Sequence, residues 1–298
     1  MVLQSSGSIS FNDIQTEFGG TNPISLNEYY LNGLYTTGTG ATGIPTSGAI
    51  SLNNFYGKSK TVAPVVNDSA ITIMGANLVL RHDGKNIDGT NNSTLIVGNV
   101  ISSWYNSGSN TGLTTTATNA FRPIYTLNGA VFSNGKLLIS NINLNNYLTM
   151  NIFVVWKKTA SSSLLKWLWS QDNGGYDRTL IINGDTRLYV GRGDGGAATP
   201  FYSFPINTTV VVNCEYNSSG LTGNFYVNNT SITSFSSLPA SGTTNTFFGS
   251  INTGTTYNGP TGSATVDGII YEIIIINRLL TSTERTNIYT TLNTKWMI

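Results

Sequence analysis

The stretch that decides the fold is residues 266–296, with the sequence VDGIIYEIIIINRLLTSTERTNIYTTLNTKW. It opens with a turn at Asp267 and Gly268 and continues as a β-branched run, whose side chains alternate between two faces of an extended chain. One face takes Ile269, Tyr271, Ile273 and Ile275, and the other takes Ile270, Ile274 and Ile276. Only Glu272 interrupts the apolar character. This pattern predicts a central strand that is covered on both sides.

A helix is predicted soon after this strand. Thr281 is a candidate N-cap, and Glu284 stands three residues later, at the spacing of a capping box. Ile288, Leu292 and Trp296 follow at intervals of four residues, which gives a short helix one apolar stripe. The strand and the helix together are predicted to form the part of the core around which a β-sandwich assembles.

The composition argues against several classes of protein. A chain of 298 residues has room for one all-β domain and a small appendage. Charged residues make up 10%, the net charge is +1 and no basic patch occurs, so we expect no nucleic-acid partner. The N-terminal residues contain Asp13 and Glu17 and no apolar run, which predicts no signal peptide. The longest apolar run is too short for a membrane helix, so we expect a protein made in a cytoplasm, without membrane insertion.

One six-residue pattern occurs three times within residues 1–60, as ISFNDI from Ile9, ISLNEY from Ile24 and ISLNNF from Ile50. Each serine predicts the N-cap of a helical turn, and Asp13 or Glu28 would complete a capping box. The apolar positions of the pattern are predicted to anchor the turns on a partner: Ile9, Phe11, Ile14, Ile24, Leu26, Tyr29, Ile50, Leu52 and Phe55. Three such turns bury too little surface to fold alone, so we expect them to fold against neighbouring subunits. A small cap packed on the following domain is an equally good alternative.

These repeats carry a resemblance. SSGSISFNDIQTEFGGTNPISLNEYY from Ser5 and IPTSGAISLNNFYGK from Ile44 resemble the N-terminal segment of many tailed-bacteriophage virion proteins, tail and fibre components in particular. The resemblance implies that residues 1–60 are a virion-mounting module, with other virion proteins as partners. It also implies a homo-oligomer located in the virion and made in the host cytoplasm. Residues 61–75 are predicted to be an extended linker, because Pro64 disfavours a helix before it.

Residues 76–298 carry a second resemblance. Turn residues recur along this segment, and Asn183-Gly184 and residues 217–220 (NSSG) predict two hairpins. The segments LVLRHD, VISSWYNSG and DGIIYEIIII resemble the laminin-G-like, concanavalin-A-like jelly-roll superfamily. The resemblance implies a mainly β protein, an antiparallel jelly-roll β-sandwich. It implies no single ligand, because the superfamily includes lectins, glycosidases, polysaccharide lyases and interaction modules.

The sequence predicts no catalytic residues. Glycosidases of this superfamily often carry an ExDxxE pattern on one strand, whereas the best strand here carries Glu272 alone. We interpret Glu272 as a structural residue bonded near the start of the closing helix, and His82, the only histidine, as a surface or turn residue. Cys214 is the only cysteine, so neither an internal disulfide nor a thiolate zinc site can form. It lies in the apolar segment VVVNCEY and is interpreted as a packing residue.

Loops rich in aromatic, amide and charged residues are candidates for glycan binding, because such side chains stack on sugar rings and bind their hydroxyl groups. The candidates are Asp172, Asn173, Tyr176, Asp177, Arg178, Arg192, Asp194, Tyr202 and Tyr257. The alternative for each loop is a solvated turn. Trp167 and Trp169 share a strand face and are expected in the core. No cofactor or metal is predicted; calcium at Asp172, Asp177 and Asp194 is a weaker alternative, because their spacing matches no known metal loop.

Two functions remain open at this stage. In the first, the chain is a tail-fibre or similar appendage protein that displays a lectin-like sandwich to glycans of the host surface. In the second, it is a head or tail decoration protein whose sandwich contacts only other virion proteins. A glycan-degrading enzyme ranks below both.

Overall fold

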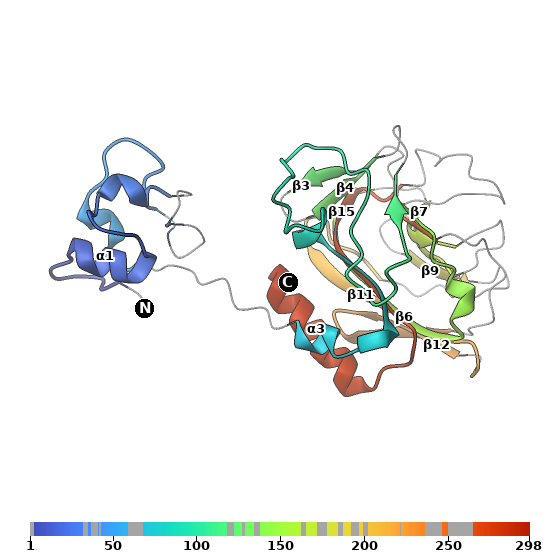
Figure 1. Ribbon diagram of the computed structural model, residues 1–298. Helices are drawn as coiled ribbons and strands as arrows, with labels where there is room; N and C mark the ends of the chain where they lie inside the picture. Colours follow the sequence, from blue (N-terminus) through green and yellow to red (C-terminus); the bar gives the residue numbers. More distant parts are fainter. Residues whose placement is uncertain are drawn as a thin grey trace. The chain divides into compact units, whose positions relative to one another are not determined.

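The structure is a computed structural model of the chain. It describes residues 3–31, 35–36, 41, 43–58, 68–117, 122–126, 129–133, 138–161, 165–171, 178–183, 187–191, 197–198, 202–220, 222–235, 246–249 and 265–298. The chain divides into two compact units, Met1–Val66 and Asn67–Ile298, both drawn in Figure 1.

Three helical elements of the first unit begin directly after a serine of the repeat: α1 (Phe11–Phe18), η1 (Leu26–Tyr29) and η3 (Leu52–Phe55). The predicted capping box of α1 is confirmed, because Ser10 Oγ accepts the N–H of Asp13 at 3.2 Å and Asp13 accepts the N–H of Ser10 at 2.8 Å. The box predicted at Glu28 is wrong. In this tighter 3-10 turn, Ser25 accepts the N–H of Asn27 at 3.4 Å instead.

The repeat builds a core inside the first unit. Its first and last positions occupy the two sites of a hydrophobic staple on either side of each cap. The last positions, Ile14, Tyr29 and Phe55, are each 0% exposed, and the rings of Tyr29 and Phe55 meet edge to face at 6.1 Å. The buried cluster comprises Leu3, Ile9, Ile14, Phe18, Tyr29, Ala41, Ile44 and Phe55. The expectation that the three turns lack a core of their own is therefore wrong, because the apolar residues that flank the three caps pack against one another.

The second unit begins with a helical segment where a linker was expected. Helix α2 (Ser69–Thr72) and turn η4 (Gly75–Asn77) occupy the second half of the predicted linker, whereas residues 59–67 lie outside the described part of the chain. Ile71 and Met74 are 0% and 4% exposed and pack against the sandwich. An extended conformation is therefore wrong for residues 69–75, because burial of these two side chains favours a helical turn.

The larger sheet is antiparallel, in the order β13-β12-β11-β6-β15-β4-β3, with β1 also paired to β15. Its strands are β1 (Leu78–Asp83), β3 (Ile124–Thr126), β4 (Gly129–Phe132), β6 (Thr149–Lys158), β11 (Thr209–Asn217), β12 (Thr222–Val227), β13 (Thr230–Phe235) and β15 (Gly268–Ile276). The short turn η5 (Gly84–Asn86) follows β1, and the short turn η7 (Leu144–Asn146) precedes β6.

The smaller sheet faces the larger one and has the order β10-β9-β8-β7-β14-β5-β2. Its strands are β2 (Thr115–Thr116), β5 (Leu138–Ser140), β7 (Leu165–Ser170), β8 (Leu180–Asn183), β9 (Arg187–Gly191), β10 (Ala197–Ala198) and β14 (Thr246–Phe248). Strands β8 and β9 pair antiparallel, as do β11 and β12, where the two hairpins were predicted. The mainly β, antiparallel sandwich is confirmed.

Strand β15 lies in the middle of the larger sheet, as predicted. It pairs with β6 along one edge, and with β4 and then β1 along the other. A register shift between Ile270 and Glu272 marks a β-bulge, and this extra residue reverses the alternation. Ile270, Ile273 and Ile275 therefore share the inner core, whereas Tyr271 packs with Ile274 and Ile276 on the opposite face. The predicted faces are wrong on the N-terminal side of the bulge for this reason.

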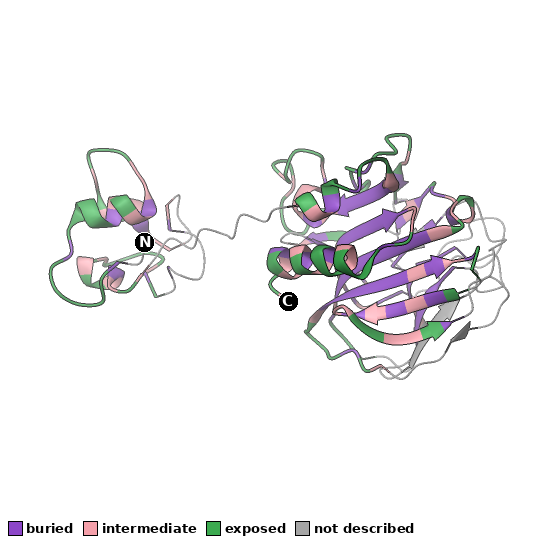
Figure 2. Cartoon of the chain, turned by 90° about the horizontal axis from the view of Figure 1, so that it is seen from below, coloured by how far each residue is buried: buried purple, intermediate pink, exposed green. Residues whose placement is uncertain are grey.

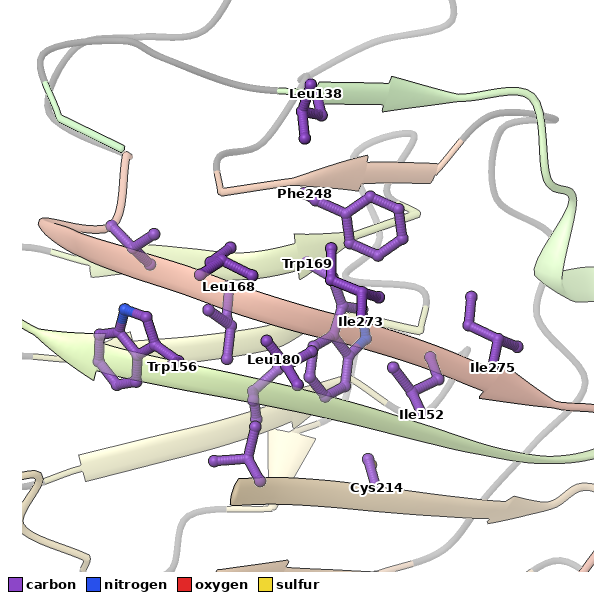
Figure 3. Close-up of a cluster of buried hydrophobic side chains, with 14 of the residues drawn as sticks. Leu138, Ile152, Trp156, Leu168, Trp169, Leu180, Cys214, Phe248, Ile273 and Ile275 are labelled. Atoms are coloured by element: carbon purple, nitrogen blue, oxygen red, sulfur yellow. The ribbon is translucent and has the colours of Figure 1, made fainter. Parts of the chain in front are cut away.

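Both faces of β15 are buried, as predicted. The inner core lies between the two sheets, where Leu168, Trp169 and Leu180 of the smaller sheet meet Ile152 and Ile273 of the larger one (Figure 3). The outer face is covered by α2 and by α3 (Ser282–Trp296), and Figure 2 shows α3 lying across the larger sheet.

The closing helix has the predicted cap and stripe. Thr281 and Glu284 form the capping box, with the Thr281 N–H donating to Glu284 Oε2 at 2.9 Å and Thr281 Oγ1 accepting the N–H of Glu284 at 3.2 Å. Ile288 and Leu292 are 0% exposed, and Trp296 packs at the edge of the same cluster.

Candidate functional site

Most of the predicted glycan-binding residues lie outside the described part of the chain. These are Asp172, Asn173, Tyr176, Asp177, Arg192, Asp194 and Tyr257, and they include all three aspartates of the calcium alternative. Arg178 and Tyr202 are described, and the structure gives them different roles.

Arg178 is a structural residue. It is 0% exposed, and its guanidinium donates to Tyr147 O at 3.0 Å and to Ser218 Oγ at 2.8 Å. The same group lies 5.0 Å from the ring centre of Tyr216. A buried guanidinium needs such partners, and here they join three segments of the fold. This burial contradicts the predicted ligand contact for Arg178.

Tyr202 begins a series of aromatic rings that leads inward. It is partly exposed and packs on Phe204 at a centroid distance of 4.7 Å, and Phe204 packs on Trp156 at 5.4 Å. Partial burial raises the pKa of the Tyr202 hydroxyl above its usual value. The N–H of Asn207 donates to Lys158 O at 2.7 Å and holds this segment against the end of β6.

A narrow pocket lies next to these rings. Trp156 and Lys158 at the end of β6, Lys166 on β7, Ile182 on β8, and Ala160, Val266 and Asp267 in the connections line it. The pocket therefore lies between the two sheets at one end of the sandwich. It is partly open, and its free space is about that of one water molecule. The sequence reasoning missed Lys158 and Lys166; the one available signal was a polar end to an otherwise apolar strand.

The pocket is rich in hydrogen-bond donors. Lys158 Nζ donates to Phe204 O at 3.4 Å, and Lys166 Nζ lies 3.2 Å from Asp267 Oδ2. Trp156 is 2% exposed, and in the described part of the chain its Nε1–H has no acceptor. Figure 3 shows the indole nitrogen on the side of the ring toward β15. Such an arrangement can bind a small acceptor group from outside.

Gly268 makes room for this indole. A Cβ atom at Gly268 would lie 2.4 Å from Trp156 Nε1 and 2.4 Å from Lys157 O, closer than real side chains approach. The absence of a side chain at the start of β15 therefore sets the position of Trp156 at the pocket.

Glu272 belongs to a buried ion cluster on the outer face of the larger sheet. Its carboxylate lies 2.8 Å from Arg81 Nε and 2.9 Å from Lys295 Nζ, and it accepts the indole N–H of Trp296 at 2.8 Å. The structural role was predicted, but the partners on α3, Lys295 and Trp296, lie in the last turn of that helix rather than near its start, and Arg81 lies on β1. Asp83 adds a second carboxylate, 2.5 Å from Lys295 Nζ.

His82 is a core residue. It is 0% exposed on β1, its Nδ1 lies 2.9 Å from Tyr105 O and its Nε2 lies 2.7 Å from Thr115 Oγ1. Burial lowers the pKa of His82 to about 4. The expectation of a surface or turn histidine is wrong, because the strand carries it between the sheets.

Cys214, Trp167 and Trp169 have the predicted packing roles. They are 0%, 7% and 0% exposed, and burial raises the pKa of the Cys214 thiol. The shared face predicted for the two tryptophans is wrong: a register shift separates them, and Trp169 joins the inner core with Leu168, whereas Trp167 is buried outside that cluster. Within the described ranges, no three His, Cys, Asp or Glu side chains gather as metal ligands. The helices of that part of the chain include none that is long and apolar enough to span a bilayer.

Comparison with known proteins gives structural neighbours alone. No protein-family model matches the chain, and a search of curated proteins finds no match. Trypanosoma rangeli sialidase in complex with 2,3-difluoro-KDN superposes with a TM-score of 0.52 at 13% identity, over 73% of this chain and 33% of that one. The same sialidase in complex with sialic acid gives 0.50 at 15% identity, over 74% and 34%. The binding domain of botulinum neurotoxin serotype D gives 0.52 at 13% identity, over 75% and 53%.

These likenesses concern the fold. The chain spans 33% of the length of the first sialidase structure and 53% of the toxin domain. At such low identity they show that the second unit has a lectin-like β-sandwich fold, in agreement with its sheet order.

Proposed function

We propose that the chain is a bacteriophage virion protein, a tail-fibre or similar appendage component whose sandwich binds a glycan of the host surface. The observation that carries the binding half of the proposal is the donor-lined pocket at Trp156, whose ring packs on Phe204 and through it on the partly exposed ring of Tyr202. An aromatic ring next to directed hydrogen-bond donors suits a sugar, which has one apolar face and many hydroxyl groups. A sialidase neighbour holds sialic acid, which supports a sugar as ligand class.

The mounting half of the proposal rests on the first unit. It is a separate compact unit that carries the repeat of the phage-like segment. The structure places most of the predicted anchors in the internal core of that unit. Phe11, at 43% exposed, is the one large hydrophobic residue exposed in the described part of the unit. Contact with other virion proteins would therefore use the outer side of α1 around Phe11.

We also propose that the chain binds without catalysis. The one carboxylate of the central strand, Glu272, is 1% exposed and held by Arg81 and Lys295. A carboxylate engaged in this way is poorly placed to act as a nucleophile or a proton donor toward a sugar.

A decoration protein is the second candidate, and one surface favours it. Ile96, Val97 and Val100 are 73%, 61% and 53% exposed, and Val100 bridges to Ile124, which is 37% exposed. A contiguous apolar patch on a soluble surface is typical of protein contacts.

A glycan array with the full chain tests the two candidates. Binding that falls in Tyr202→Ala and persists in Tyr105→Ala is expected. Tyr202 packs through Phe204 on the pocket residue Trp156, whereas Tyr105 is exposed and belongs neither to that series of rings nor to the pocket lining. The absence of binding across host glycans, together with binding to a purified virion protein that depends on Ile96 and Val97, would favour decoration.

A further inference from the structure

The pocket at the end of the sandwich has an imbalance between donors and acceptors. Lys158, Lys166 and Trp156 present two ammonium groups and one indole N–H, whereas Asp267 is the one carboxylate in the lining. Asp267 is already engaged by Lys166 at 3.2 Å. The four groups carry a formal net charge of +1, from two lysines and one aspartate.

The indole N–H is the second, independent sign of a ligand. Trp156 is 2% exposed, and its Nε1–H has no acceptor among the residues that the structure describes. Buried donors are almost always bonded, so an orphaned donor at a partly open pocket indicates an acceptor that comes from outside. Gly268 preserves this position, because a Cβ there would lie 2.4 Å from the nitrogen.

We propose that this pocket binds the carboxylate of an acidic sugar, with the Trp156 N–H and the Lys166 ammonium as its donors. The inference rests on the proposed glycan-binding function and names the class of sugar. One carboxylate oxygen has the size of the water molecule that the pocket admits. The rest of the sugar would lie outside, on the side where Tyr202 is partly exposed.

A neutral sugar fits this lining less well. Its hydroxyl group could accept one hydrogen bond, but it would gain nothing from the net positive charge. A carboxylate accepts from several donors at once, and charge-assisted hydrogen bonds are about twice as strong as neutral ones. The carboxylate of Asp267 repels an incoming anion. The attraction of the pocket for a carboxylate therefore depends on the positive charge of Lys166.

The experiment uses the full chain, an array of hexuronides and sialosides, and their methyl esters, which keep the shape and lose the charge. We expect acidic glycans to bind about tenfold or more tightly than their esters. Trp156→Phe and Lys166→Met should each lower the affinity for the acidic glycan about tenfold and leave the ester unaffected. Lys157→Met is the matched control, because Lys157 neighbours Lys158 on β6 with its side chain on the opposite face.

The outcomes separate this inference from the function on which it rests. Equal binding of acids and esters, or binding of acidic glycans unchanged in Trp156→Phe, would overturn the acidic-sugar inference and leave glycan binding intact. Acetate that competes as tightly as the acidic glycans would show a simple anion site and also overturn it. No binding of any glycan would overturn both. Thermal unfolding of each variant establishes that the loss is not one of folding.

Discussion

At the scale of single residues, burial decides the protonation state of a side chain, which the residue type alone does not. His82 lies between the sheets, stacked on Trp104 at a centroid distance of 5.6 Å, with both ring nitrogens engaged. Burial lowers its pKa from 6.5 to about 4. The imidazole is therefore neutral in the folded state at neutral pH and serves packing and hydrogen bonding.

This histidine should make the sandwich sensitive to mild acid. Since the unfolded chain binds a proton below about pH 6.5 and the folded chain only near pH 4, stability should fall as the pH drops through this window. Between pH 7 and pH 5 the loss from His82 is about 2 kcal/mol. Urea unfolding followed by tryptophan fluorescence measures it, and His82→Gln should flatten the slope. An unchanged slope would assign the pH dependence to other groups.

The close approach at Gly268 gives a second residue-scale prediction. Gly268→Ala should lower the free energy of unfolding by about 1–3 kcal/mol, because the new methyl group meets backbone oxygen and indole nitrogen that have little room to move. Gly112→Ala is the control; its Cβ would meet one side-chain oxygen at 3.5 Å. Equal effects at the two glycines would contradict the steric account.

At the scale of elements, the last helix is held to the larger sheet by an apolar face and by ions. Ile288 and Leu292 pack on the sheet, and the last turn brings Lys295 and Trp296 to Glu272. Arg81 joins the same carboxylate from β1. One buried carboxylate thus connects β1, β15 and α3.

Removal of that carboxylate should be costly. Glu272→Ala leaves Arg81 and Lys295 buried, at 5% and 6% exposed, with Asp83 as their remaining shared carboxylate, and we expect a loss of about 3 kcal/mol. Glu215→Ala, which removes one hydrogen bond from Asn224, should cost about 1 kcal/mol. Denaturant titration compares the two. A loss at Glu272 no larger than at Glu215 would show that the cluster contributes little.

At the scale of the whole molecule, the two units have separate cores. The first unit is built around Ile14, Tyr29 and Phe55, and the sandwich has its own two clusters. All five tryptophans belong to the sandwich unit, whereas the aromatic residues of the first unit are tyrosine and phenylalanine. Tryptophan fluorescence therefore reports on the sandwich alone.

A charge in the first core should unfold one unit and spare the other. In Ile14→Asp, hydrogen exchange in residues 3–58 should lose its protection, because a carboxylate at a 0% exposed position has no partner there. The tryptophan-detected transition of the sandwich should stay unchanged. A shift of that transition would show that the units are coupled.

The mounting proposal is tested at the exposed position. Phe11→Asp should leave residues 3–58 protected and yet abolish incorporation into virions, since the side chain is exposed and outside the core. Phe11→Leu should retain incorporation. If the Phe11→Asp variant is incorporated into normal particles, α1 is not part of the proposed interface.

The sequence by itself determined those features that depend on neighbours along the chain. Capping boxes at Ser10 and Thr281, the two hairpins and the doubly covered strand follow from short-range hydrogen bonds and alternation, and they are confirmed. The antiparallel sandwich follows from these elements together with the jelly-roll resemblance.

Only the tertiary structure decided what distant segments do to one another. The bulge in β15 reversed part of its alternation, and packing took Arg178 and His82 from predicted surface sites into the interior. The pocket could not be predicted, since it brings together ends of strands that are far apart in the chain. Local sequence patterns indicate which secondary structure the backbone prefers. Burial and ion pairing depend on which strands become neighbours, and the packing of the whole sandwich determines that.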